Sequence, residues 1–133
     1  MSEKKFVNPP GLKPLGMYSN VACGGNLVFI SGQVAVDAEG RTVGKGNMEA
    51  QAVQVFENLK LALQGVGATF QDVLKFTIFI CDLTPEARKA VMTVRSRYIN
   101  QARPPAATMI GVDRLVQDDL MLEIEAVAMV DDK

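Results

Sequence analysis

Two carboxylates, Glu123 and Glu125, lie in an otherwise apolar stretch near the end of the chain, Leu120–Ala128. Residues alternate between the two faces of a β-strand, so both glutamates are expected on one face and the apolar residues between them on the other. A buried carboxylate is costly unless it is paired or takes part in chemistry. We predict Glu125 as a candidate general acid or base. A purely structural hydrogen bond stays open for Glu125, and pairing is the favoured interpretation of Glu123.

The composition argues against several other kinds of chemistry. The chain has no histidine and only two cysteines, Cys23 and Cys81, which are far apart in sequence. A histidine-dependent catalytic triad is therefore excluded, and we expect no metal and no cofactor. The net charge is −1 and the basic residues are scattered, so nucleic acid is an improbable partner.

The location of the protein is also predicted from the sequence. No apolar run reaches the length that spans a membrane, and the first residues lack the apolar core of a secretory signal. We therefore expect a cytoplasmic protein with two reduced thiols and no membrane partner.

The elements that would position these residues follow from hydrophobic periodicity and turn chemistry. Residues 1–20 are rich in turn-forming residues, and the pattern predicts one domain over residues 1–133. Strands are predicted at Lys5–Val7, Val21–Cys23, Leu27–Ile30, Val34–Val36, Arg41–Val43 and Val73–Ile80, and in the runs 103–112 and 120–128.

Two helices are predicted between these strands. The first begins at Asn47, a good N-cap, and ends at Gly65. The second begins at Thr84-Pro85, and Pro104-Pro105 excludes any further helix. The apolar stripe of the first helix is predicted at Val53, Phe56, Leu59, Leu63 and Val66.

This order of elements is typical of an α+β sandwich, in which one mixed sheet carries two helices on one face. The other face of the sheet would then be apolar and uncovered. An uncovered apolar face on a small domain usually indicates an oligomer.

An ordered set of short motifs resembles the RidA/YjgF family, also known as L-PSP endoribonuclease-like proteins. The resemblance extends from Asn8 to Ala128 and includes Gly25–Gln33, Arg95-x-Arg97-Tyr98, Pro104-Pro105-Ala106 and Glu123-Ile124-Glu125-Ala126. It implies a chorismate-mutase-like fold and a homotrimer whose sheets form a barrel. It also implies a cleft for a small-molecule ligand at each subunit interface.

The family's founding activity is the hydrolysis of reactive enamines and imines to keto acids and ammonia. The resemblance assigns Glu125 to the glutamate that positions water, and it assigns Tyr18, Ser31 and Met109 to the cleft. The arginine that holds the substrate carboxylate falls on Ala107, so the chain resembles an arginine-lacking branch. Arg103, just before the same strand, is the best placed of four arginines that could replace it; the others are Arg95, Arg97 and Arg114.

Two functions therefore stay open at this stage. The first is a hydrolytic imine or enamine deaminase that uses Glu125. The second is a non-catalytic trimer that binds a small metabolite or a partner protein, because Ala107 removes the substrate-binding cation. RNA cleavage ranks last, since the chain has neither a histidine nor a basic stripe.

Overall fold

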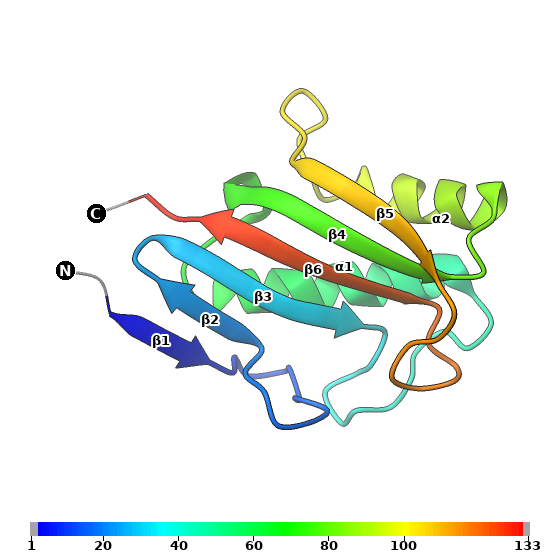
Figure 1. The fold of residues 1–133 in the computed structure, drawn as a ribbon, viewed down its shortest axis with the longest axis horizontal. Helices are drawn as coiled ribbons and strands as arrows, with labels where there is room; N and C mark the ends of the chain where they lie inside the picture. Colours follow the sequence, from blue (N-terminus) through cyan, green and yellow to red (C-terminus); the bar gives the residue numbers. More distant parts are fainter. Residues whose placement is uncertain (1–2, 132–133) are drawn as a thin grey trace.

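The computed structural model describes residues 3–131 as six strands and two α-helices (Figure 1). The elements, in chain order, are β1 (Lys4–Val7), β2 (Val21–Gly24), β3 (Leu27–Val34), α1 (Met48–Gln64), a 3₁₀ turn (Phe70–Asp72), β4 (Val73–Cys81), α2 (Pro85–Arg95), β5 (Ala106–Val112) and β6 (Leu122–Met129).

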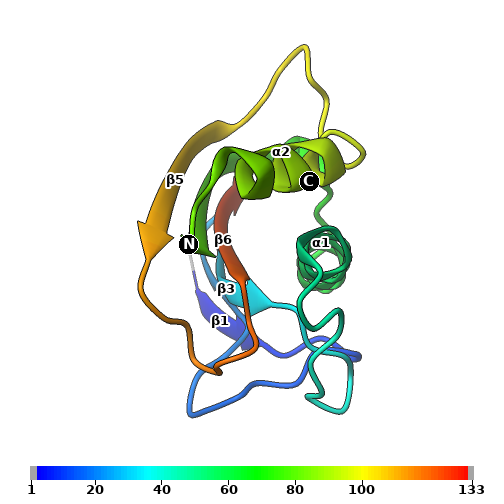
Figure 2. The same ribbon diagram turned by 90° about the vertical axis from the view of Figure 1, so that its right-hand side faces the viewer.

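The six strands form one mixed sheet in the order β1-β2-β3-β6-β4-β5. Neighbouring strands are antiparallel except β4 and β5, which are parallel and are joined through α2. A parallel pair needs such a crossover connection. Figure 2 shows both helices on one face of the sheet. The predicted α+β sandwich is therefore confirmed, with β4 as an interior strand.

Both helices begin where their capping residues predict. The side chain of Asn47 accepts a hydrogen bond from the Ala50 backbone N–H, and that of Thr84 accepts one from the Ala87 N–H. Each cap satisfies a backbone donor that the first turn of a helix leaves without a partner. Pro85 follows as the first residue of α2. Neither helix combines the length and apolarity needed to cross a bilayer, within residues 3–131.

The buried face of α1 differs from the predicted stripe. Phe56, Leu59 and Leu63 are buried as expected, but Val53 is only partly buried. Two polar residues, Gln51 and Asn58, are buried on α1 instead. Periodicity of apolar residues does not detect them, because their amides are buried only by bonding to backbone groups.

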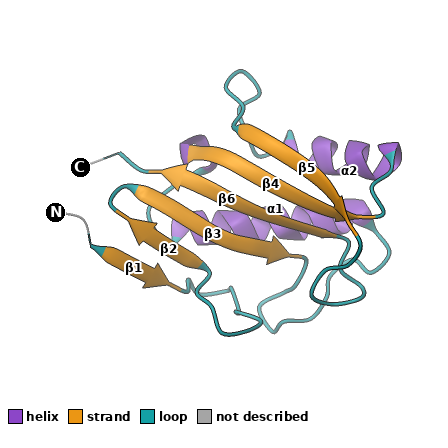
Figure 3. Ribbon diagram, in the orientation of Figure 1, coloured by secondary structure: helices purple, strands orange, loops and turns teal. Residues whose placement is uncertain are grey.

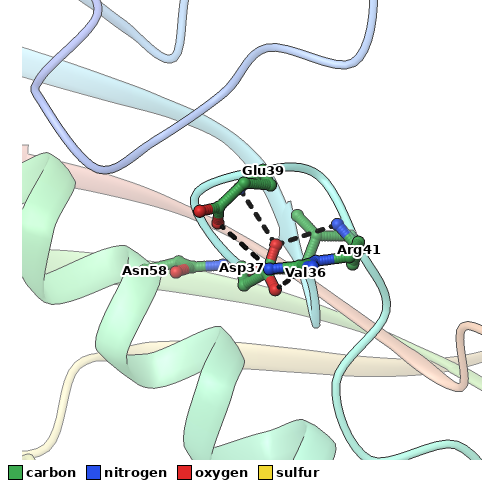
Figure 4. A network of polar contacts seen from close by, with 5 residues as sticks. All are labelled: Val36, Asp37, Glu39, Arg41 and Asn58. Carbon is green, nitrogen blue, oxygen red and sulfur yellow. Dashed lines mark hydrogen bonds and ion pairs between the residues drawn. The ribbon is translucent and has the colours of Figure 1, made fainter.

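Asn58 holds the chain at the end of β3. Its Nδ2 donates to the backbone oxygens of Val34 and Val36, at 3.0 Å each. Figure 4 shows Asn58 beside Val36. The separate strands predicted at 34–36 and 41–43 are not formed; these segments meet only in an isolated bridge between Val36 and Thr42. The physical reason is that the backbone oxygens of Val34 and Val36 accept hydrogen bonds from Asn58 instead of from a neighbouring strand.

A tight turn follows Val36. The carboxylate of Asp37 accepts hydrogen bonds from the backbone N–H groups of Glu39 and Arg41, at 2.9 Å each, as Figure 4 shows. Such local bonds are the usual reason for aspartate in turns. These backbone bonds lower the pKa of Asp37, although burial opposes them.

Three loops gather at one end of the sheet: residues 8–20, 35–47 and 113–121 (Figure 3). Gln51 connects two of them to α1, since its Nε2 donates to the backbone oxygens of Gly44 and Asp119 and its Oε1 accepts from the Met121 N–H. Irregular loops fixed in this way by buried amides can carry a rigid site.

Candidate functional site

A cavity of about 320 Å³ lies where the loop 8–20 meets β3 and β6. Its lining includes the side chains of Tyr18, Ser31 and Glu123 and the backbone of Gly32. The remaining lining residues are Leu15, Gly16, Val34 and Val116. A volume of this size is at the lower end of the range for small-molecule sites.

A β-bulge in β3 shapes the cavity. Ile30 pairs with Ala126 and Gln33 pairs with Ile124, so β3 has one more residue than β6 over this interval. Bulges of this kind redirect side chains next to functional sites. At Gly32, a Cβ atom would overlap the carboxylate of Glu123. Glycine at this position therefore lets the Glu123 side chain lie against the β3 backbone.

Glu123 supplies the carboxyl group in the lining of this cavity. Its side chain is half-buried, and no salt bridge reaches it among residues 3–131. Burial raises the pKa of its carboxyl group, and the negative charge of Glu125 raises it further. A carboxyl group with a raised pKa in a cleft is a candidate for proton transfer.

Tyr18 and Ser31 are fixed by hydrogen bonds with the loop 8–20. The Ser31 hydroxyl donates to the backbone oxygen of Ser19 at 2.7 Å, and the Tyr18 hydroxyl accepts from the Leu15 N–H at 3.0 Å. Tyr18 is 43% exposed, so its ring is a wall of the cavity rather than part of the core. Both residues therefore shape the cavity and offer polar atoms to a ligand.

The structure brings Tyr18 and Ser31 together with Glu123 rather than with Glu125. Glu125 is exposed, pairs with Thr77 of β4 and does not line the cavity. Strand alternation puts the two glutamates on the same face and cannot distinguish them. The bulge in β3 and the absence of a side chain at Gly32 leave room for the carboxylate of Glu123 in the cavity lining.

The other predicted ligand residues lie elsewhere in the chain. Ala107 and Met109 belong to β5, where they pair with Phe76 and Ile78 on the helix side of the sheet. Glu123 pairs with Phe79, which points to the opposite face. Arg103 is exposed and lines a different cavity, of about 420 Å³. One chain alone therefore does not join these residues to the Glu123 cavity.

Sequence reasoning did not assign Glu123 and Gly32 to the cavity. A glycine between two apolar strand runs, as in Ser31-Gly32-Gln33, is a recognised sign of a bulge or of a close approach. That sign could have identified Gly32, though not the carboxylate above it. No group of three or more metal-ligating side chains occurs in the part of the chain that the structure describes.

The family model described as Endoribonuclease L-PSP matches residues 10–130. The chain belongs to the L-PSP family. This is the RidA/YjgF family that the sequence motifs resemble, and the match covers both the cavity and the β5–β6 segment.

Relatives of the L-PSP family match along almost the whole chain. A RutC family protein of Pyrococcus abyssi is 36% identical over 96% of this chain and 98% of its own length. A 2-iminobutanoate/2-iminopropanoate deaminase of Dermatophagoides farinae is 30% identical over 98% of this chain and 100% of its own.

Solved structures of the L-PSP family share the fold. A Thermotoga maritima structure is 35% identical, covers 96% of this chain and 98% of its own, and superposes with a TM-score of 0.85. The RidA structure from a Psychrobacter species is 28% identical, covers 94% of this chain and 98% of its own, and has a TM-score of 0.84. The fold of this chain is therefore the fold of these L-PSP proteins.

Proposed function

We propose that this protein hydrolyses a small imine or its enamine tautomer in the cavity formed by Tyr18, Ser31 and Glu123. The observation that carries the proposal is Glu123, a half-buried carboxyl group with a raised pKa and no cationic partner among residues 3–131. The relative from Dermatophagoides farinae, a 2-iminobutanoate/2-iminopropanoate deaminase, supports this substrate class.

The chemistry requires one group that both accepts and donates a proton. Water adds to the imine carbon, and one of its protons passes through Glu123 to the nitrogen as the C–O bond forms, which gives a carbinolamine. Glu123 then takes the proton of the carbinolamine hydroxyl and gives it to the nitrogen as the C–N bond breaks, which releases ammonia and leaves a carbonyl group. Tyr18 and Ser31 line the same cavity and would orient the substrate.

We further propose that the molecule is a homotrimer with its clefts at subunit interfaces. One face of the sheet carries exposed aromatic side chains, with Phe6 67% and Phe29 50% exposed. Exposed apolar groups of this size are typical of interaction surfaces. A second copy would also be needed to bring Ala107 and Met109 to the Glu123 cavity, because one chain holds them on opposite faces of the sheet.

The second candidate function is binding without catalysis, and Ala107 is the observation that favours it. Alanine cannot form the bidentate pair with a carboxylate that arginine forms. A trimer of this arginine-lacking kind would hold a metabolite or dock a partner protein without accelerating a reaction.

An in-situ imine assay separates the two functions. 2-Iminopropanoate is generated by an amino acid oxidase, and its decay is followed with the parent protein, Glu123→Gln and Glu125→Gln. We expect the parent to accelerate the decay, Glu123→Gln to lose about 100-fold or more of that acceleration, and Glu125→Gln to retain it.

Two results would contradict this proposal. Loss of activity in Glu125→Gln with full activity in Glu123→Gln would return the catalytic role to Glu125. An inert parent that binds 2-oxobutanoate by calorimetry would favour the binding function instead.

A further inference from the structure

Arg95, the last residue of α2, is an unusually buried cation. Only 8% of the residue is exposed. Its guanidinium carbon lies 5.9 Å from the centre of the Phe76 ring, in the layer between α2 and β4. Contact with an aromatic face stabilises a guanidinium, but it does not neutralise the charge.

The charge of Arg95 has no anionic partner within the described chain. No carboxylate of residues 3–131 lies within 4.0 Å of its guanidinium nitrogens. Its Nε is buried without a hydrogen-bond partner, and Nη1 donates only to the Met92 sulfur, a weak acceptor, at 3.8 Å. Burial lowers the pKa of Arg95, which is the sign of a desolvated cation. Buried charges in proteins are normally paired, so an anionic partner for this cation would have to come from outside the described chain.

A cavity beside Arg95 gives such an anion a place. It has a volume of about 360 Å³ and is lined by Arg95, Met92, Ser96, Ile99, Gln101 and Pro104. Arg95 is the only charged residue of this lining. The others are three apolar side chains and two neutral polar ones.

We propose that this cavity binds a small organic carboxylate, with Arg95 as its counter-ion. A single guanidinium matches the single charge and planar shape of a carboxylate, whereas phosphate sites usually combine several donors or cations. Met92, Ile99 and Pro104 offer contacts to an apolar substituent, and the side-chain amide of Gln101 offers a hydrogen-bond donor. The Ser96 hydroxyl already donates to the Thr93 backbone oxygen at 2.6 Å. Inorganic phosphate has no apolar substituent to contact the three apolar side chains.

This site is separate from the Glu123 cavity within one chain. Arg95 packs against Phe76 on the helix side of the sheet, and Glu123 projects from the other face. The proposal therefore does not depend on imine hydrolysis. It would hold for a binding protein as well as for an enzyme.

Calorimetric titration of the full-length protein in its native assembly tests the proposal. The probes are benzoate, its neutral analogue benzamide, and inorganic phosphate. We expect benzoate to bind at least about 10-fold more tightly than either of the other probes. Removal of a desolvated charge pair typically costs 2–5 kcal/mol, so Arg95→Met should weaken benzoate binding by about 30-fold or more.

Two further variants sharpen the test. Arg97→Met serves as the matched control, because Arg97 is exposed and pairs with Glu49 at 3.5 Å, and it should bind benzoate like the parent. Arg95→Lys keeps the charge without the planar fork and should bind more weakly than the parent but more tightly than Arg95→Met.

Stability distinguishes a binding role for Arg95 from a structural one. Replacing an unpaired buried charge with an apolar side chain of similar size is usually neutral or stabilising. We therefore expect Arg95→Met to unfold at the same or a higher temperature than the parent, while benzoate raises the unfolding temperature of the parent alone.

Three results would overturn the proposal. Equal binding of benzamide and benzoate would show that the charge is not used, and equal or tighter binding of phosphate would remove the carboxylate assignment. A parent that binds no benzoate, together with an Arg95→Met variant whose assembly dissociates, would assign Arg95 to a contact with a carboxylate of another copy.

Discussion

Gly32 controls where the Glu123 carboxylate lies, since a Cβ at position 32 would occupy the same space. The carboxyl group is held against the β3 backbone, where burial raises its pKa. A difference of a single methyl group in β3 thus decides where a side chain on β6 can lie. This dependence is testable without touching the glutamate itself.

The variant Gly32→Ala should displace Glu123 and remove the proposed activity. The overlapping atoms belong to a flexible side chain, so the chain can fold with the carboxylate moved aside. We expect the loss in the imine assay to be about as large as that of Glu123→Gln, on the order of 100-fold. The cost in stability should be about 1 kcal/mol or less.

Gly24→Ala is the matched control for this variant. Gly24 also lies in a strand, and a Cβ there would meet no atom within 4 Å. Full activity in Gly24→Ala with no activity in Gly32→Ala would support the steric argument. Full activity in both variants would contradict it.

The raised pKa of Glu123 also predicts a pH-dependent stability. The folded chain keeps this proton to a higher pH than the unfolded chain, because burial raises the folded-state pKa. The contribution of this group is therefore complete at low pH and is lost as the pH rises above the ordinary glutamate value. Since Gln does not ionise, Glu123→Gln should gain stability relative to the parent between about pH 4 and pH 7.

Urea unfolding at the two pH values measures this difference. Glu125→Gln removes only the neighbouring negative charge, the smaller of the two causes, and should change the pH dependence in the same direction but less. A gain for Glu123→Gln that is equal at both pH values would contradict the prediction.

The sequence predicted the face of Glu123 and Glu125 but not their environments. Alternation along β6 depends only on residue order, and Leu122 and Ile124 are buried as that pattern requires. The choice between the glutamates depends on a bulge in β3, a strand about 90 positions earlier in the chain. A single sequence contains no signal for that pairing beyond the glycine itself.

At the scale of elements, helix α1 anchors the loops through amides that are buried among apolar side chains. Asn58 donates hydrogen bonds to two backbone carbonyl groups at the end of β3. Gln51 bonds to the loops on either side of α1. The caps at Asn47 and Thr84 were predictable, because capping is a local interaction. Gln51 and Asn58 were not, because their partners are distant in sequence.

The variant Asn58→Ala should destabilise the protein by about 2 kcal/mol, within the usual cost of leaving buried acceptors without partners. The carbonyl groups of Val34 and Val36 would lose their donor. Urea unfolding measures the loss. Gln64→Ala is the control, because Gln64 is exposed on the same helix and alanine is a favourable helical residue. A loss for Asn58→Ala no larger than that of the control would contradict the anchoring role.

At the scale of the whole molecule, the sheet divides the chain into two sides with different chemistry. The helix side carries the core and Arg95, and the other side carries Glu123, exposed apolar residues and no covering element among residues 3–131. The sequence predicted this uncovered face from the number of helices and strands. It did not predict an unpaired guanidinium within the helix layer.

The uncovered face of the sheet predicts how copies of the protein assemble. If copies pack through this face, a charge at Phe29 should be buried without a partner and should dissociate them. Light scattering should give the parent a mass about three times the 14.4 kDa of one chain, and Phe29→Lys the mass of one chain. Gln64→Lys is the control, because Gln64 is exposed on α1, on the helix side of the sheet.

If the clefts are shared between subunits, Phe29→Lys should lose both its assembly and its activity in the imine assay. Phe29 does not line the Glu123 cavity, so a folded, monomeric Phe29→Lys keeps every cavity residue of its own chain. In the proposed trimer it would lose only what a second copy supplies, including Ala107 and Met109. An inactive monomer would support clefts shared between subunits, and a fully active monomer would show that one chain is sufficient for the chemistry.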